Sequence, residues 1–349
     1  MNNQAPVGIV STGMYLPKKI LTAAEIAAQS GMPEWVVREK LGLKQKYVAG
    51  PEEHPNQMAI WAAQDCLAKC DLKPEEIDVV LCTTEEWKEY LLWTAGIHLA
   101  HEIGATNAWA MDLHMRCCTT IAAMRTAKDM MRANPDVKTV LIAGGYSVGH
   151  LINFKNPRTS FMFNIGAGAA AMLLRKDWPA NHVLGSHLMI DGSMSKHVIV
   201  PASGTVQHPT DEAVAQNLFY FDLVEPEAMK SRLNEVSMEN WMRCIDAALR
   251  QSDKRPDGQA LTRADIDFLN MILVKPSAHR DMLARLGLRE EQAVYLSDYG
   301  HIGEQDSIIA MIEGEKQGRL KAGDLMMMVG AGIGYVWGAA CVRWGKSKP

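Results

Sequence analysis

The order of expected strands and helices in the first half of the chain is repeated in the second half. Each half has a long amphipathic helix, a strand that contains Ile-Asp, a turn followed by a helix, and a further apolar strand that ends in glycine. The paired segments are 56–70 and 233–250, 74–81 and 264–269, and 137–145 and 323–330. Self-similarity on this scale predicts two copies of one βαβ-rich unit. We therefore expect an α/β protein of two duplicated halves, residues 1–176 and 177–349.

Further local patterns predict elements around this repeat. Thr22 followed by Glu25 is typical of a capped helix. Residues 201–238 are polar and contain Gly204, Pro209 and Pro226, which predicts an irregular insert between the halves. Such an insert is either a lid or tunnel wall, or a solvated connector.

Two adjacent cysteines stand immediately before a predicted helix at 119–131. Ile121, Met124, Ala127 and Met131 recur there at helical spacing. A cysteine at a helix N-terminus meets the positive end of the macrodipole and free N–H groups, which favour the thiolate and lower its pKa. Cys117 is therefore the candidate nucleophile. The alternative is a packing role, because free cysteines are among the most buried residues.

His301 is the candidate catalytic base. It lies in a turn with glycine on both sides, after a predicted strand at 293–296 and before a predicted helix at 307–317. The repeat places this turn where the Cys117 turn stands in the first half, so the two turns should meet. Asp306 follows at a helix start and is placed to fix the tautomer of His301. Cys117, His301 and Asp306 thus predict a nucleophile, a base and an orienting group, although capping roles remain an alternative for the last two.

A glycine-rich run at 329–338 follows the last repeated strand. It lacks the Lys-Ser/Thr of a P-loop and leads into another apolar run instead of a helix. We expect closely approaching backbone there, with N–H groups free to bind an oxyanion.

Composition excludes several classes of function. The net charge of −4 gives no nucleic-acid footprint. No apolar run reaches 18 residues and the N-terminus lacks a signal-peptide pattern, so neither a membrane span nor export is expected. The seven cysteines lack disulfide-framework spacing, which is typical of a cytoplasmic protein. No metal is expected, because Cys66 and Cys70 have no second ligand pair at zinc spacing.

Together these motifs resemble the thiolase superfamily, and within it the 3-oxoacyl-ACP synthase III (ketoacyl synthase III) branch of fatty acid biosynthesis. The family's Phe-Asp-x4-Cys motif is matched from Met111 to Cys117, which selects Cys117 over Cys118. Its Gly-Asp-Gly-Ala-Gly-Ala turn is matched by 164–169, and its closing glycine-rich motif by 330–339. The early Glu-Trp segment is matched at Trp35.

The resemblance implies a five-layered αβαβα thiolase fold, a homodimer, and an acyltransferase that works through a cysteinyl thioester. It implies an oxyanion hole formed by the backbone N–H groups of Cys117 and Ile333, and contact of Trp35 with coenzyme A. The implied substrate is an acyl-CoA or another phosphopantetheine thioester on an acyl carrier protein, without a permanently bound cofactor. The candidates for binding the phosphates of coenzyme A or an acidic carrier protein are Arg38, Lys40, Lys44 and Lys46, and ordinary surface charge is the alternative for each.

Two departures from the family pattern bear on the reaction. Pro276 stands where the family has a catalytic histidine, and His301 stands where it has an asparagine. This His/Asn pair polarises the malonyl thioester, so its loss counts against carbon–carbon condensation. A Gly-His-x-Gly-x-x-Asp pattern resembles instead the branch that transfers acyl groups in secondary metabolism. His279 is an alternative second hydrogen-bond donor.

Several functions therefore stay open on the sequence. Decarboxylative condensation with a malonyl thioester and acyl transfer to a hydroxyl or amine are the leading alternatives. A non-catalytic thiolase-fold partner subunit is another. A synthase of the hydroxymethylglutaryl type is the last, and it would need a catalytic glutamate from Glu85, Glu86 or Glu89.

Overall fold

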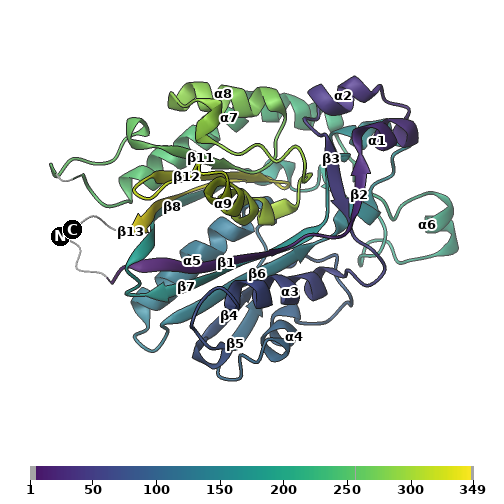
Figure 1. Cartoon of the computed structure of the whole chain (residues 1–349). Helices are drawn as coiled ribbons and strands as arrows, with labels where there is room; N and C mark the ends of the chain where they lie inside the picture. Colours follow the sequence, from purple (N-terminus) through teal and green to yellow (C-terminus); the bar gives the residue numbers. More distant parts are fainter. Residues whose placement is uncertain (1–4, 256, 347–349) are drawn as a thin grey trace.

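The computed structural model describes residues 5–255 and 257–346. Layers of helices and strands alternate through the molecule (Figure 1). Helices α7 (Pro226–Arg250) and α8 (Pro276–Leu286) form one outer layer, and α3 (Pro55–Leu67) and α4 (Ala95–Glu102) form the other. Helices α5 (Thr119–Ala133) and α9 (Asp306–Lys316) lie in the middle, between the two layers of strands. This is the five-layered αβαβα arrangement that the sequence predicts.

The strands show the internal repeat directly. They follow one another in the order β11-β12-β13-β8-β1-β7-β6-β4-β5. Their bounds are β1 Val7–Tyr15, β4 Val79–Cys82, β5 Trp109–Asp112, β6 Thr139–Tyr146, β7 Gly168–Lys176, β8 Ala180–Ile190, β11 Phe268–Met271, β12 Leu325–Gly332 and β13 Val336–Lys346. At the centre, β1 and β8 pair through Gly8 and His182. From this contact outward, both halves have two antiparallel pairings and then parallel ones.

Residue 176, the predicted boundary, is the last residue of β7, and a short turn connects it to β8. The middle helices α5 and α9 are enclosed between the two layers of strands. On α5 the apolar positions predicted from periodicity are fully buried, and most of α9 is buried as well. Each of these helices is preceded by one turn of 3₁₀-helix, Arg116–Cys118 before α5 and Gly303–Gln305 before α9. The repeat therefore places the two turns at the same end of the middle layer.

A small hairpin completes the first half. Strands β2 (Lys19–Thr22) and β3 (Gln45–Val48) pair with each other and flank helices α1 (Ala23–Ser30) and α2 (Glu34–Glu39). The predicted cap of α1 is confirmed, because Glu25 N–H donates to Thr22 Oγ1 and the Glu25 carboxylate accepts from Thr22 N–H. No helix in the described ranges is both long and apolar enough to span a bilayer.

Two predictions about the second half are wrong. Residues 226–238 are not irregular, because α7 begins at Pro226. Proline is favoured at the first position of a helix, because the N–H that it lacks would have no partner within the helix there. The rest of the insert contains only α6 (Asp211–Ala215) and the short pair β9 (Val198–Ile199) and β10 (Asp222–Leu223). The strand expected at 293–296 is reduced to a bridge between Ala293 and Leu269.

Candidate active site

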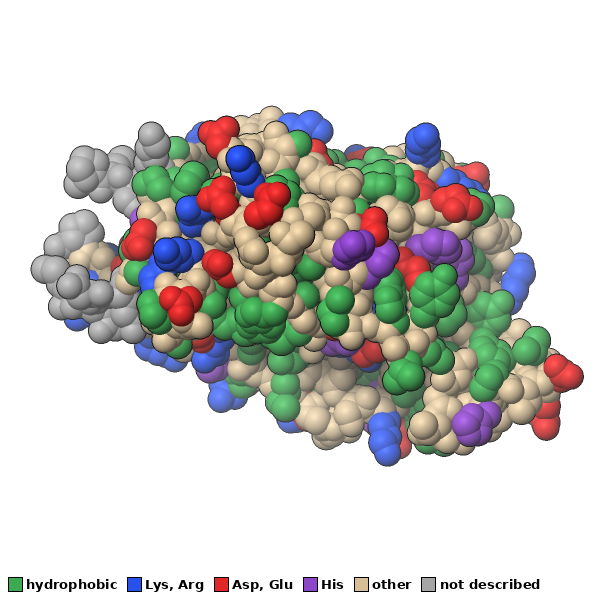
Figure 2. Space-filling model, turned by 90° about the horizontal axis from the view of Figure 1, so that it is seen from below, with side chains coloured by type: hydrophobic (Ala, Val, Ile, Leu, Met, Phe, Trp, Pro, Cys, Tyr) green, Lys and Arg blue, Asp and Glu red, His purple; other side chains and the backbone are tan. Residues whose placement is uncertain are grey.

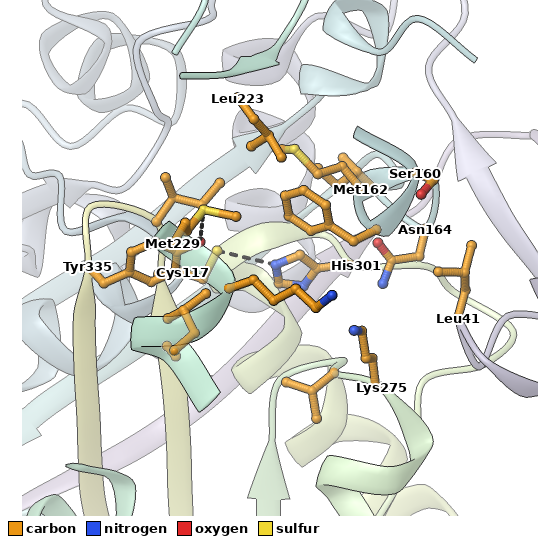
Figure 3. A pocket seen from close by; sticks show the side chains of 18 of the residues that line it. Leu41, Cys117, Ser160, Met162, Asn164, Leu223, Met229, Lys275, His301 and Tyr335 are labelled. Atoms are coloured by element: carbon orange, nitrogen blue, oxygen red, sulfur yellow. Dashed lines mark hydrogen bonds between the residues drawn. The ribbon is translucent and has the colours of Figure 1, made fainter. Parts of the chain in front are cut away.

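The Cys117 turn and the His301 turn meet inside the molecule. Cys117 Sγ lies 3.2 Å from His301 Nε2, within hydrogen-bond distance (Figure 3). On the other side of the imidazole, His301 Nδ1 lies 2.6 Å from Asp306 Oδ2. Cys117 is 9% exposed and Asp306 is fully buried. The sequence therefore brings a thiol, an imidazole and a carboxylate into one hydrogen-bonded chain across two halves of the fold.

The backbone around Cys117 is held by short-range bonds. Arg116 adopts a left-handed conformation, with φ of 50°. Thr119 Oγ1 accepts from Met115 N–H at 2.7 Å and donates to the Arg116 carbonyl at 2.6 Å. This sharp turn directs Cys117 toward the cavity at the start of α5.

The glycine-rich run lies directly against this turn, as predicted. A Cβ atom added to Gly332 would stand 2.9 Å from the Cys117 backbone nitrogen, and one added to Gly330 would stand 3.1 Å from the Cys117 carbonyl oxygen. Ile333, the next residue, lines the same cavity as Cys117. Among the backbone hydrogen bonds of the described residues, none engages Ile333 N–H.

Asp306 anchors the His301 turn as well as the imidazole. Its Oδ1 accepts from Ile302 N–H at 2.7 Å, and its Oδ2 also accepts from Leu273 N–H at 2.8 Å. The N–H of His301 donates to the Asn164 carbonyl at 2.8 Å. With both its backbone and its Nδ1 held, His301 directs Nε2 toward Cys117.

Burial and charge act in opposite directions on the catalytic pair. Burial raises the pKa of the Cys117 thiol, and the charge and hydrogen bond of His301 only oppose this. The lowered pKa predicted from the helix N-terminus is therefore wrong, because the cost of removing a thiolate from water exceeds the benefit from the helix. Burial alone would lower the pKa of His301, but the charges of Asp306 and Cys117 raise it well above its usual value. His301 is thus a strengthened proton acceptor.

Two buried glutamates lie near this chain. Burial raises the pKa of Glu304 well above its usual value, and the charge of Glu85 raises it further. Burial also raises the pKa of Glu85, although Arg116, which donates to it at 3.2 Å, opposes this. Glu85 Oε1 and Glu304 Oε2 are buried and meet no hydrogen-bond partner among the described residues. The sequence pointed to Glu85 only as an alternative and missed Glu304, because an acidic residue in a polar turn is usually exposed.

A cavity of about 700 Å³ opens above Cys117 and His301 (Figure 3). Its walls are largely apolar, and Met162, Leu223 and Met229 point into it together with the labelled Tyr335. The irregular insert and the first turns of α7 supply part of this wall. The segment expected to be either a lid or tunnel wall, or a solvated connector, therefore lines the cavity. Its cationic lining residues are Arg158, Lys230 and Lys275, none of which the sequence singled out.

The residues predicted to contact coenzyme A lie close to this cavity but not in its lining. Trp35 is 54% exposed on α2, and Lys40 Nζ stands 5.9 Å from the centre of its ring. Arg38 pairs with Glu34 at 2.6 Å. Arg38 and Lys40 border a separate groove of about 580 Å³, whereas the adjacent Leu41 lines the main cavity.

His279 also lies in this separate groove. Its ring is buried against Tyr295, and burial lowers its pKa to about 4. The structure therefore does not bring His279 to Cys117 as a second donor. No cluster of three or more potential metal ligands occurs among the described residues.

Comparison with known proteins shows which enzymes the chain is similar to. Residues 111–192 match the family model of 3-oxoacyl-[acyl-carrier-protein] synthase III, and residues 257–344 match the model of its C-terminal part. The β-ketoacyl-[acyl-carrier-protein] synthase III of Symbiobacterium thermophilum is 29% identical, over 98% of this chain and 99% of that protein. Along nearly its whole length the chain is similar to 3-oxoacyl-ACP synthase III enzymes.

Solved structures share this fold over nearly the whole chain. 3-Oxoacyl-ACP synthase III from Pseudomonas aeruginosa superposes with a TM-score of 0.79 at 21% identity, covering 99% of this chain and all of that one. A variant of OleA from Xanthomonas campestris gives 0.77 at 17% identity, over 97% of this chain and 98% of that one.

Proposed function

We propose that the protein is a 3-oxoacyl-ACP synthase III-type acyltransferase in which Cys117 carries the acyl group as a thioester. The observation that supports this most directly is the hydrogen-bonded chain from Cys117 through His301 to Asp306 beside the main cavity. Nucleophile, base and orienting group are present together, which argues against a non-catalytic partner subunit.

The first half-reaction follows from these positions. His301 Nε2 accepts the thiol proton as Cys117 Sγ attacks the carbonyl carbon of an acyl thioester. The negative oxygen that forms is bound by the N–H groups of Cys117 and Ile333. When the intermediate collapses, the carbon–sulfur bond to the donor breaks, and His301 returns the proton to the departing thiolate. The products are the acyl-enzyme and the free thiol of coenzyme A or of a carrier protein.

The second half-reaction transfers the acyl group to an acceptor. The site favours a hydroxyl or amine acceptor, because His301 is a base with a raised pKa and a carboxylate partner. Decarboxylative condensation needs two donors aimed at one carbonyl, and Pro276 supplies none. Condensation with a malonyl thioester is the second candidate, and it is supported by the names of the relatives. The hydroxymethylglutaryl-type alternative is not supported, because Glu85 is not among the cavity-lining residues.

The donor is an acyl-CoA or an acyl carrier protein, used as a substrate with no permanently bound cofactor. Arg158, Lys230 and Lys275 line the cavity and are placed to meet phosphate or carboxylate groups of a substrate. Trp35, Arg38 and Lys40 on and after α2 are proposed to hold the nucleotide outside the cavity. The methionine-rich apolar wall accommodates the acyl chain.

A homodimer is the proposed assembly. Exposed apolar side chains gather around the loop before α4 and on the edge strand β5, including Trp87, Tyr90, Leu91, Leu92 and Trp109. Figure 2 views the molecule from the side on which these elements lie and shows hydrophobic side chains on that surface. An exposed apolar cluster beside an unpaired sheet edge is typical of an association surface.

Intact-protein mass spectrometry tests the proposal. Wild type and Cys117→Ala are incubated with a panel of acyl-CoAs, and the mass of any adduct gives the acyl chain. An adduct seen only in the wild type supports the cysteinyl thioester. Adding malonyl-CoA, or a hydroxyl or amine acceptor, then shows which one removes the adduct. Absence of any adduct with coenzyme A and carrier-protein donors would contradict the proposal.

A further inference from the structure

Lys46 on β3 is buried in the protein interior, and no carboxylate among the described residues pairs with it. It is 3% exposed, and its ammonium donates to the Phe163 carbonyl at 2.9 Å and to the Ile165 carbonyl at 2.7 Å. The third side of the ammonium faces the Phe154 ring, at 5.1 Å from its centre. Burying a cation costs free energy, and the bonds to these two carbonyls must offset that cost.

The segment that Lys46 holds is the one on which the His301 turn is docked. The carbonyls of Phe163 and Ile165 accept from Lys46 Nζ, and the carbonyl of Asn164 between them accepts from His301 N–H at 2.8 Å. Gly166 N–H donates back to the His301 carbonyl at 2.8 Å. The segment 163–166 is thus fixed between the ammonium of Lys46 and the backbone of His301.

The packing leaves little room for adjustment. A Cβ atom added to Gly300, the residue before His301, would stand 2.6 Å from Lys46 Cβ and 2.9 Å from the Asn164 carbonyl oxygen. The neighbouring Tyr47 N–H donates to the Tyr299 carbonyl at 3.2 Å. The strand that carries Lys46 therefore touches the His301 turn directly as well as through 163–166.

We propose that Lys46 is a positioning residue for His301: by fixing the carbonyls of Phe163 and Ile165, its ammonium sets the backbone of His301 and so the contact of the imidazole with Cys117. This inference rests on the proposed function, in which His301 serves Cys117. Lys46 itself does not touch the cavity that contains Cys117.

The charge of Lys46 makes the arrangement sensitive to pH. Burial lowers the pKa of Lys46 to about 7. The titratable groups that line the same small pocket are Lys19, Tyr47 and His150, and no carboxylate lines it among the described residues. Below pH 7 the ammonium makes charge-assisted bonds to both carbonyls, and these weaken when the amine becomes neutral above pH 7. Arginine at this position would keep its charge throughout.

The test uses the rate at which iodoacetamide alkylates Cys117, followed by peptide mass spectrometry from pH 6 to 9.5. This probe needs the Cys117–His301 contact but no acyl substrate. Lys46→Met should slow alkylation at pH 7 by about tenfold or more, since a misplacement of 1 Å costs on the order of 10²-fold in catalysis. The difference should narrow toward pH 9.5, because the wild-type Lys46 is then neutral and its bonds to the two carbonyls are weakened. Lys46→Arg should react like wild type at pH 6 and faster above pH 8.

A matched control is Lys128→Met. Lys128 is also a buried lysine that donates to a carbonyl, that of Leu184, but it lies on α5 away from the His301 turn. Its variant should alkylate at the wild-type rate. If Lys46→Met does not fold, Lys46→Gln, which keeps a shorter amide donor, is measured in the same way. A wild-type alkylation profile in the folded Lys46 variants, or an equal loss in Lys128→Met, would overturn the inference.

A second measurement separates this inference from the proposed function. With an acyl-CoA donor that loads the wild type, Lys46→Met should lower kcat for acylation and leave KM largely unchanged. If the wild type forms no adduct with any donor while the alkylation difference persists, the proposed function fails and the role of Lys46 stands.

Discussion

Asp306 binds His301 through the ring and through the turn that carries it. Its Oδ2 lies 2.6 Å from His301 Nδ1, and its Oδ1 accepts from the N–H of Ile302, the next residue, at 2.7 Å. One carboxylate therefore sets both the position of the imidazole and the tautomer that presents Nε2 to Cys117. Because Asp306 is fully buried at the start of α9, this arrangement is rigid.

Replacing Asp306 by asparagine should keep the shape and remove the charge. The charge of Asp306 raises the pKa of His301, and only the neutral imidazole accepts a proton. In the wild type, acyl transfer to a hydroxyl or amine should therefore rise with pH with a midpoint above the ordinary histidine value. In Asp306→Asn the midpoint should move to lower pH, and the plateau should fall by about 10²-fold or more. The pH–rate profile of acyl transfer measures both effects, and an unchanged midpoint would contradict them.

The two adjacent cysteines should behave differently. Cys117 faces the cavity and His301, whereas Cys118 packs against Gly330 and Gly338 behind it. Cys117→Ala should abolish the acyl adduct. Cys118→Ala should retain the adduct and lose about 1 kcal/mol of stability from the small cavity it leaves. Intact mass and thermal melting of both variants check this, and an adduct lost only in Cys118→Ala would reverse the assignment.

Much of this arrangement could be predicted from the sequence because it rests on local patterns and on the repeat. The capping pair at Thr22 and the apolar spacing of α5 are short-range features, and both were confirmed. The contact between Cys117 and His301 spans 184 positions. It could be anticipated only because the repeat places the two turns at equivalent points.

What the sequence could not supply depends on long-range burial. The helix N-terminus alone favours a thiolate at Cys117, but the enclosing cavity walls reverse the direction of its pKa shift. Lys46 looked like a surface cation available to phosphates, and the structure buries it against two carbonyls. Pro226 looked like part of an irregular insert and is the first residue of α7. In each case the neighbours that decide the outcome are distant in the chain.

Glu304 should reduce stability at neutral pH. Its folded pKa is raised by burial and by Glu85, so the native state binds more protons than the unfolded chain between the ordinary glutamate pKa and the raised one. The free energy of unfolding must then fall as pH rises through that window. Glu304→Gln keeps a carbonyl oxygen that can accept from Gln305 Nε2, as Glu304 does at 2.7 Å, and has no charge to bury. Its Tm should exceed that of the wild type at pH 8, with a smaller difference at pH 5.

Glu212→Gln provides the control for this comparison. Glu212 is an exposed residue on α6 that also accepts from a glutamine, Gln216, at 2.8 Å. Its substitution should leave the melting temperature unchanged at both pH values. The prediction is contradicted if Glu304→Gln melts below the wild type by the same margin at pH 8 and at pH 5. The charge of Glu304 would then not reduce the stability of the folded protein.

The proposed dimer surface can be disrupted at Leu92. Leu91 is 85% exposed and Leu92 is fully exposed, on the loop that precedes α4. If this loop is covered by a second copy, Leu92→Asp buries an unpaired charge and should weaken association by about 2 kcal/mol or more, roughly thirtyfold in Kd. Analytical ultracentrifugation across a concentration series measures the shift. Val206→Asp is the matched control, because Val206 is equally exposed outside this cluster. Equal association of Leu92→Asp and Val206→Asp would exclude this loop from the interface, and the exposed apolar side chains would then need a different partner.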